Sequence, residues 1–185
     1  VGMQQSREEE RIKQLRDPAH QREAFAQVVN FYGEKLYWQI RKMVLDHDDA
    51  NDLLQNTFLK AWMNIDYFRG EAKLSTWLYK IAINECITFL NRQRAQNNVS
   101  IDDTDVFLLE RLKGDEYFDG DAAQMKLQEA ILTLPEKQRA VFNMKYFDDM
   151  KYEDMSEIFG TSVGALKASY HHAVKKVEEF LTKDI

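Results

Sequence analysis

Helix-breaking residues are scarce along this chain of 185 residues, which contains only two prolines and seven glycines. Residues with high helix propensity, such as Leu, Ala, Lys, Glu and Gln, are plentiful. Apolar side chains also recur at helical spacing, for example over 53–65, where Leu54, Phe58, Ala61 and Ile65 fall on one face. We therefore predict an all-α fold.

Composition narrows the class of protein further. The single cysteine, Cys86, excludes an internal disulfide and suits a reducing compartment. No apolar run approaches the roughly 18 residues that a membrane span requires, and the polar start does not resemble a signal peptide. We expect a cytoplasmic protein with no membrane insertion.

Residues 95–121 are strongly acidic. Eight acidic residues stand there against Arg111 and Lys113, so this segment carries the whole net charge of −6. We interpret 96–121 as an acidic linker between two small helical domains, 1–95 and 122–185. A solvated spacer is one interpretation, but "VFLLERL" could form a short helix and its apolar residues could bind something.

Helix boundaries in the first domain follow from capping residues. Asp17 suits the N-cap of a helix over 17–44, after a polar, frayed segment 1–16. Acidic residues then open a second helix over 46–65. A loop around Gly70 follows, and the side-chain hydroxyl of Ser75 or Thr76 would cap the next helix.

That next helix has two different faces. Leu78, Ala82 and Cys86 fall on an apolar stripe that we predict to face the core. A stripe on the opposite side combines an aromatic ring, a cation, a hydroxyl and amides, namely Trp77, Lys80, Asn84, Thr88 and Asn91. Such groups can stack on unpaired bases and hydrogen-bond to them. Alternatively, Trp77 is a core residue and Asn84 a tolerated polar residue.

The second domain ends in a helix-turn-helix pattern. Helices are predicted over 122–132, 135–147 and 152–159, and Gly160 is placed to stop the last of these. Thr161 or Ser162 would cap a final helix that runs at least to the late 170s.

The N-terminal half of that final helix carries the polar groups of a recognition helix. The candidates for contacts with duplex DNA are Ser162, Lys167, Ser169, His171 and Lys175. Backbone N–H groups at the start of this helix could also hold a phosphate. A structural helical hairpin with a basic face is the alternative.

Three motifs in order resemble an extracytoplasmic-function (ECF) sigma factor of bacterial RNA polymerase. "DDANDLLQNTFLKAW" resembles region 2.2 of that family, and "FRGEAKLSTWLYKIAINECITFLNRQR" resembles regions 2.3 and 2.4. "LPEKQRAVFNMKYFDDMKYEDMSEIFGTSVGALKASYHHAVKKV" resembles region 4. The match covers roughly residues 20–95 and 122–181.

The resemblance implies three surfaces. The helix over 49–62 would bind core polymerase, through Asp49, Asp52, Leu53, Gln55 and Asn56. The loop over 68–74 would hold a base flipped from the −10 element. The surface around this loop would bind single-stranded DNA through Phe68, Arg69, Lys73, Trp77, Lys80, Asn84, Thr88 and Arg92. Arg94 would contact a phosphate, as would Arg92. The helix-turn-helix would read the −35 element, with Lys167 as its principal contact.

This chain departs from the pattern of the family at the start of the recognition helix. The recognition helix of the family commonly begins Gly-Thr-Val-Lys/Arg-Ser-Arg, whereas Gly164 is followed here by Ala165, Leu166, Lys167, Ala168 and Ser169. The family further implies an anti-sigma factor as partner, no cofactor, and a linker that threads through the nucleic-acid channels of the polymerase.

Two other classes of protein are alternatives. An operator-binding regulator would bind duplex DNA tightly without polymerase. A metal-dependent phosphohydrolase could use His47, Asp48, Asp49 and Asp52, but the remaining histidines lack a matching context, and acids that open a helix explain the cluster better. We expect no metal and no enzyme activity.

Overall fold

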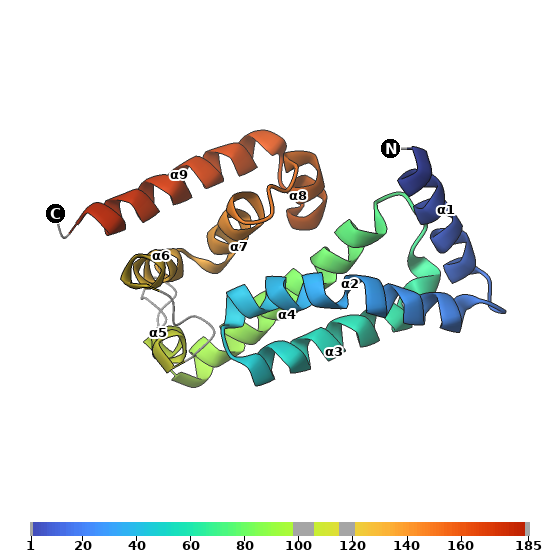
Figure 1. The fold of residues 1–185 in the computed structure, drawn as a ribbon, viewed down its shortest axis with the longest axis horizontal. Coiled ribbons are helices and arrows are strands. Elements are labelled where there is room, and N and C mark those ends of the chain that lie inside the picture. Colours follow the sequence, from blue (N-terminus) through green and yellow to red (C-terminus); the bar gives the residue numbers. More distant parts are fainter. Residues whose placement is uncertain (1, 98–105, 115–120, 184–185) are drawn as a thin grey trace.

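The computed structural model describes residues 2–97, 106–114 and 121–183, without the side chains of Asn97, Val106 and Phe107. Every regular element in these ranges is helical (Figure 1). In chain order the elements are α1 (Gly2–Arg16), α2 (Gln21–Val44), α3 (His47–Met63), the short 3-10 helix η1 (Ile65–Tyr67), α4 (Leu74–Asn97), α5 (Val106–Gly114), α6 (Ala122–Leu132), α7 (Glu136–Tyr146), α8 (Tyr152–Phe159) and α9 (Val163–Thr182).

The helices form two groups that pack against each other. Helices α2, α3 and α4 pack pairwise, with α1 against α2, while α9 packs on α6, α7 and α8. Helix α8 lies on α4, and α7 lies on α2, so the second group covers one side of the first (Figure 1). One buried apolar cluster extends from α2 and α4 to Met144 of α7 and Met155 of α8. The two groups therefore share a core.

Polar contacts cross the same boundary. Arg139 of α7 is fully buried, and its Nη2 donates to the carbonyl of Met43 at the end of α2, at 3.3 Å. Lys42 Nζ lies 3.9 Å from Oδ1 of Asp148, whose other oxygen accepts from Gln39. A buried arginine must be paired or hydrogen-bonded to be tolerated, so Arg139 ties the second group closely to the first.

Local capping signals were predicted correctly at several ends. The Asp46 carboxylate accepts from the Asp49 N–H at 3.0 Å at the start of α3, and Ser162 Oγ accepts from the Ala165 N–H at 3.1 Å at the start of α9. Gly160 ends α8 with a φ of 67°. These interactions depend only on nearby residues, which is why sequence reveals them.

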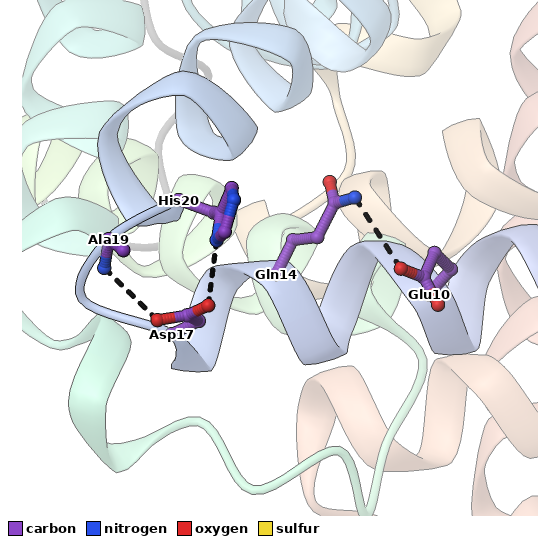
Figure 2. A network of polar contacts seen from close by, with 5 residues as sticks. All are labelled: Glu10, Gln14, Asp17, Ala19 and His20. Carbon is purple, nitrogen blue, oxygen red and sulfur yellow. Dashed lines mark hydrogen bonds and ion pairs between the residues drawn. The ribbon is translucent and has the colours of Figure 1, made fainter.

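The start of the chain differs from the prediction. Residues 2–16 form helix α1 rather than a frayed segment, and Leu15 is only 1% exposed. Helix α2 begins at Gln21, so Asp17 is not its N-cap. Instead the Asp17 carboxylate accepts from the Ala19 N–H at 3.1 Å and lies 2.7 Å from His20 Nδ1, which closes the turn between α1 and α2 (Figure 2).

The cap predicted for α4 is also wrong. Helix α4 begins at Leu74, ahead of Ser75 and Thr76, and Thr76 is buried inside its first turn. The Leu74 N–H donates to Oε1 of Glu8, at 3.0 Å. A side chain from α1 therefore supplies the acceptor that we expected from a neighbouring hydroxyl.

The linker is more than a spacer. Its apolar stretch forms α5, as one interpretation allowed, and the side chains of Leu108 and Leu112 are fully buried in the main core. The predicted acidic residues over 102–105 and 115–120, and the side chains of Val106 and Phe107, lie outside the described residues.

Candidate nucleic-acid interface

The polar stripe predicted on α4, which we call the α4 stripe (Trp77, Lys80, Asn84, Thr88 and Asn91), is accessible along most of its length. Lys80, Asn84 and Thr88 are exposed, although α8 packs on the same helix. The Trp77 ring is half-buried and lies 4.9 Å from the ring of Phe68, measured between centroids and tilted by 32°. Phe68 itself is only 4% exposed, so its ring packs against the buried side of Trp77 and is not available to solvent.

The loop that precedes α4 carries two exposed cations. Arg69 and Lys73 both reach solvent, on either side of Gly70, whose φ of 78° favours glycine. Lys73 Nζ lies 3.3 Å from Oδ2 of Asp154, on the first helix of the helix-turn-helix. The second helical group thus reaches the loop directly.

The two arginines near the end of α4 have different surroundings. Arg92 is exposed and lines a groove. Arg94 is only 5% exposed and forms an ion pair with Glu136 at the start of α7. In this arrangement Arg92 can meet a phosphate, whereas Arg94 helps to join the two helical groups.

That groove runs between α3 and α4 and has a volume of about 230 Å³. Its walls combine candidates for polymerase binding with candidates for DNA binding: Asp49, Asp52, Leu53 and Asn56 from α3, and Glu85, Thr88, Phe89 and Arg92 from α4. Glu85 pairs with Lys60 of α3. The fold thus brings the two predicted surfaces into one continuous region.

The predicted polymerase-binding residues on α3 are not equally available. Asp52, Gln55 and Asn56 are exposed, but Leu53 is buried at 6% exposure and packs in the core. Asp49 is half-buried, and its Oδ2 lies 2.8 Å from Nη1 of Arg111 in α5. Burial raises the pKa of Asp49 above its ordinary value, and the nearby Arg111 cation partly opposes that shift.

Sequence reasoning missed an apolar extension of the exposed face of α3. Leu59, Met63 and Tyr67 are 58%, 68% and 78% exposed. They follow Gln55 at successive spacings of four residues, so they continue its side of the helix into η1. That spacing is visible in the sequence, but the prediction considered only the other apolar face of this helix, the one expected to be buried.

The recognition helix of the helix-turn-helix presents most of its predicted residues. Lys167, His171 and Lys175 are exposed on α9, and Ser162 is engaged as its N-cap. Lys167 Nζ lies 5.7 Å from the centre of the Tyr152 ring of α8. Ser169 is half-buried, and its carbonyl accepts from Gln138 at 3.4 Å, so it is the least available member.

The histidine and the acidic residues at the start of α3 make local contacts. Asp46 caps α3, and His47 Nδ1 lies 2.6 Å from the hydroxyl of Tyr37. Over residues 2–97, 106–114 and 121–183 no three His, Cys, Asp or Glu side chains are placed to hold a metal ion. Among the same residues, no helix is both long enough and apolar enough to cross a membrane.

Comparison with known protein families matches both helical groups. The model of Sigma-70 region 2 matches residues 28–96, and that of Sigma-70 region 4 matches residues 124–177. The ECF RNA polymerase sigma factor SigW of Bacillus subtilis is 31% identical, over 87% of this chain and 89% of that protein. The RNA polymerase sigma factor SigV of the same organism is 30% identical, over 76% of this chain and 81% of that protein.

Solved structures show the same fold. The sigma factor RpoE of Bartonella quintana, solved with the anti-sigma factor NepR, is 23% identical with a TM-score of 0.64, over 87% of this chain and 98% of that one. CnrH, solved with the cytosolic domain of CnrY, is 21% identical with a TM-score of 0.65, over 89% of this chain and 91% of that one.

The chain belongs to the ECF RNA polymerase sigma factors. It is a transcription initiation factor, not an enzyme, and it acts with core RNA polymerase on promoter DNA. These relatives do not favour a regulator that works without polymerase.

Proposed function

We propose that residues 1–95 bind core polymerase and open the −10 element, while residues 122–185 read the −35 element. The exposed part of the α4 stripe carries this proposal. Lys80, Asn84 and Thr88 face solvent on the same helix as the half-buried Trp77, and Thr88 also lines the groove that α4 shares with α3. Unpaired bases can stack on the indole and hydrogen-bond to the amide, which offsets the few kcal/mol, roughly, that base flipping costs.

The same proposal assigns the remaining surfaces. Core polymerase would bind the exposed face of α3, through Asp52, Gln55 and Asn56, with Asp49 at its N-terminal end. Duplex −35 DNA would meet α9 through Lys167, with His171 and Lys175 behind it. The two exposed lysines, Lys167 and Lys175, can neutralise phosphates, so binding should weaken as the salt concentration rises.

An anti-sigma factor is the proposed regulatory partner. Support comes from the sigma factor RpoE, which has this fold and was solved with the anti-sigma factor NepR. We assign the protein to the cytoplasm, where promoter DNA and core polymerase are found. No cofactor enters the proposal.

Run-off transcription with purified core polymerase on a promoter library tests this function, with permanganate probing of unpaired thymines at the −10 element. Asn84→Ala should abolish promoter-specific transcripts and −10 opening. Asn30→Ala, an exposed asparagine on α2, serves as the matched control and should leave both unchanged.

Two results would contradict the proposal. If Asn84→Ala still opened the −10 element fully, the exposed stripe of α4 would have no role in promoter melting. A shift of duplex DNA by the protein alone, with no core binding and no transcripts, would point to an operator-binding regulator.

A further inference from the structure

The loop over 68–73 has few backbone interactions of its own. Phe68 N–H donates to the Ile65 carbonyl, and the Lys73 carbonyl accepts from Trp77. Between these two ends, the described part of the chain offers residues 69–72 no backbone–backbone hydrogen bond. Contacts from elsewhere must therefore hold the loop in shape.

One such contact precedes the loop. Gln21, the first residue of α2, donates from Nε2 to the carbonyl of Leu15 at 2.9 Å and to Oδ1 of Asp66 at 3.0 Å. Asp66 belongs to η1, directly before the loop. The amide of Gln21 thus joins the end of α1 to the segment from which the loop starts.

A second contact meets the middle of the loop. Gly70 has a φ of 78°, and a Cβ atom built on it would lie 3.4 Å from Cγ2 of Ile12. Helix α1 therefore approaches the loop closely at the turn glycine. A larger residue at position 70 would be strained by its backbone angle, and its Cβ would lie in ordinary van der Waals contact with Ile12.

The third contact is at the end of the loop. The first N–H groups of a helix have no partner within the helix, and the helix dipole favours a negative charge near them. Glu8 of α1 meets both needs, because its Oε1 accepts from the Leu74 N–H at 3.0 Å. This carboxylate therefore caps the start of α4, three residues before Trp77.

We propose that α1 is a positioning element for capture of the −10 base, with Glu8 and Ile12 as its principal residues. The inference rests on the proposed function of residues 1–95, in which the loop over 68–73 would hold the flipped base of the −10 element. A pocket for a flipped base must be formed in advance, because a loosely held loop would lose selectivity between bases. Figure 1 shows α1 beside the segment that leads into α4, outside the stretch matched by the region 2 family model.

The test compares the four bases at the captured −10 position of a promoter that this protein recognises. Glu8→Ala should lower the ratio of initiation between the preferred base and the others by about fivefold, as expected for one lost helix cap. Ile12→Ala should act in the same direction. Glu8→Gln keeps an acceptor oxygen and should restore part of the ratio, while Glu9→Ala, on the exposed side of α1, is the control.

The affinity of each variant for core polymerase and its footprint over the −35 element are measured in parallel, and neither should change. The inference would be overturned if Glu8→Ala and Ile12→Ala left the base ratio intact. It would also be overturned if initiation fell equally for all four bases together with the melting temperature, since that indicates a structural role alone. If the wild-type protein did not distinguish the bases at all, the proposed function of the loop would fail as well.

Discussion

Lys73, in the loop before α4, and Asp154, in the first helix of the helix-turn-helix, form an ion pair of 3.3 Å between the two helical groups. Lys73 was predicted to contact the −10 strand. Its ammonium group is thus shared between an intramolecular carboxylate and the proposed DNA ligand.

Asp154→Asn should therefore strengthen binding of a single-stranded −10 oligonucleotide to the free protein. Exposed ion pairs are worth about 0.2–1 kcal/mol, so we expect an increase of up to about fivefold, reduced at high salt. Fluorescence anisotropy measures the affinity, and Glu153→Gln on the same helix is the control. Equal gains from both variants would show only an effect of net charge.

Arg111→Ala should strengthen binding to core polymerase. Asp49 lies in the proposed polymerase surface but is paired with Arg111 of α5. Loss of this half-buried pair would free the carboxylate and would lower the stability of the free protein by about 1 kcal/mol or less. The affinity for fluorescently labelled core polymerase should rise by up to about fivefold, whereas Lys113→Ala, exposed on the same helix, should leave it unchanged. Weaker binding by Arg111→Ala would contradict this role.

Lys167→Ala should weaken −35 binding by roughly 1–3 kcal/mol. Lys167 is an exposed cation in the N-terminal half of α9. DNase footprinting of the holoenzyme measures the loss, with Lys137→Ala on α7 as a matched lysine variant. An unchanged −35 footprint would exclude Lys167 from recognition.

Cys86 should make the fold sensitive to high pH. The thiol is fully buried, which raises its pKa from 9.0 to about 12. A pKa that is higher in the folded state stabilises the protein below pH 9, and the benefit is lost as pH rises toward 12. Between pH 8 and 10, the free energy of unfolding in urea should fall by about 1 kcal/mol more in the wild type than in Cys86→Ala. Parallel losses in the two proteins would refute the assignment.

Sequence alone determined the elements whose signals are local. The helical stop at Gly160, the cap at Ser162 and the acidic start of α3 depend on residues within one turn, and their structures agree with the predictions. The α4 stripe was visible because side chains at helical spacing share a face whatever the rest of the fold does.

Only the tertiary structure decided which charges are free and which are paired. Arg94 meets Glu136, 42 positions later, and Leu74 is capped by Glu8, 66 positions earlier. No local pattern encodes such partners, because they come together only when apolar faces of distant helices are buried in one core. For the same reason the sequence indicated a polar, frayed segment where α1 forms and left a solvated spacer open where α5 forms, although Leu15, Leu108 and Leu112 are buried. Burial of these few leucines places both helices against the surfaces that the sequence had marked for polymerase and promoter.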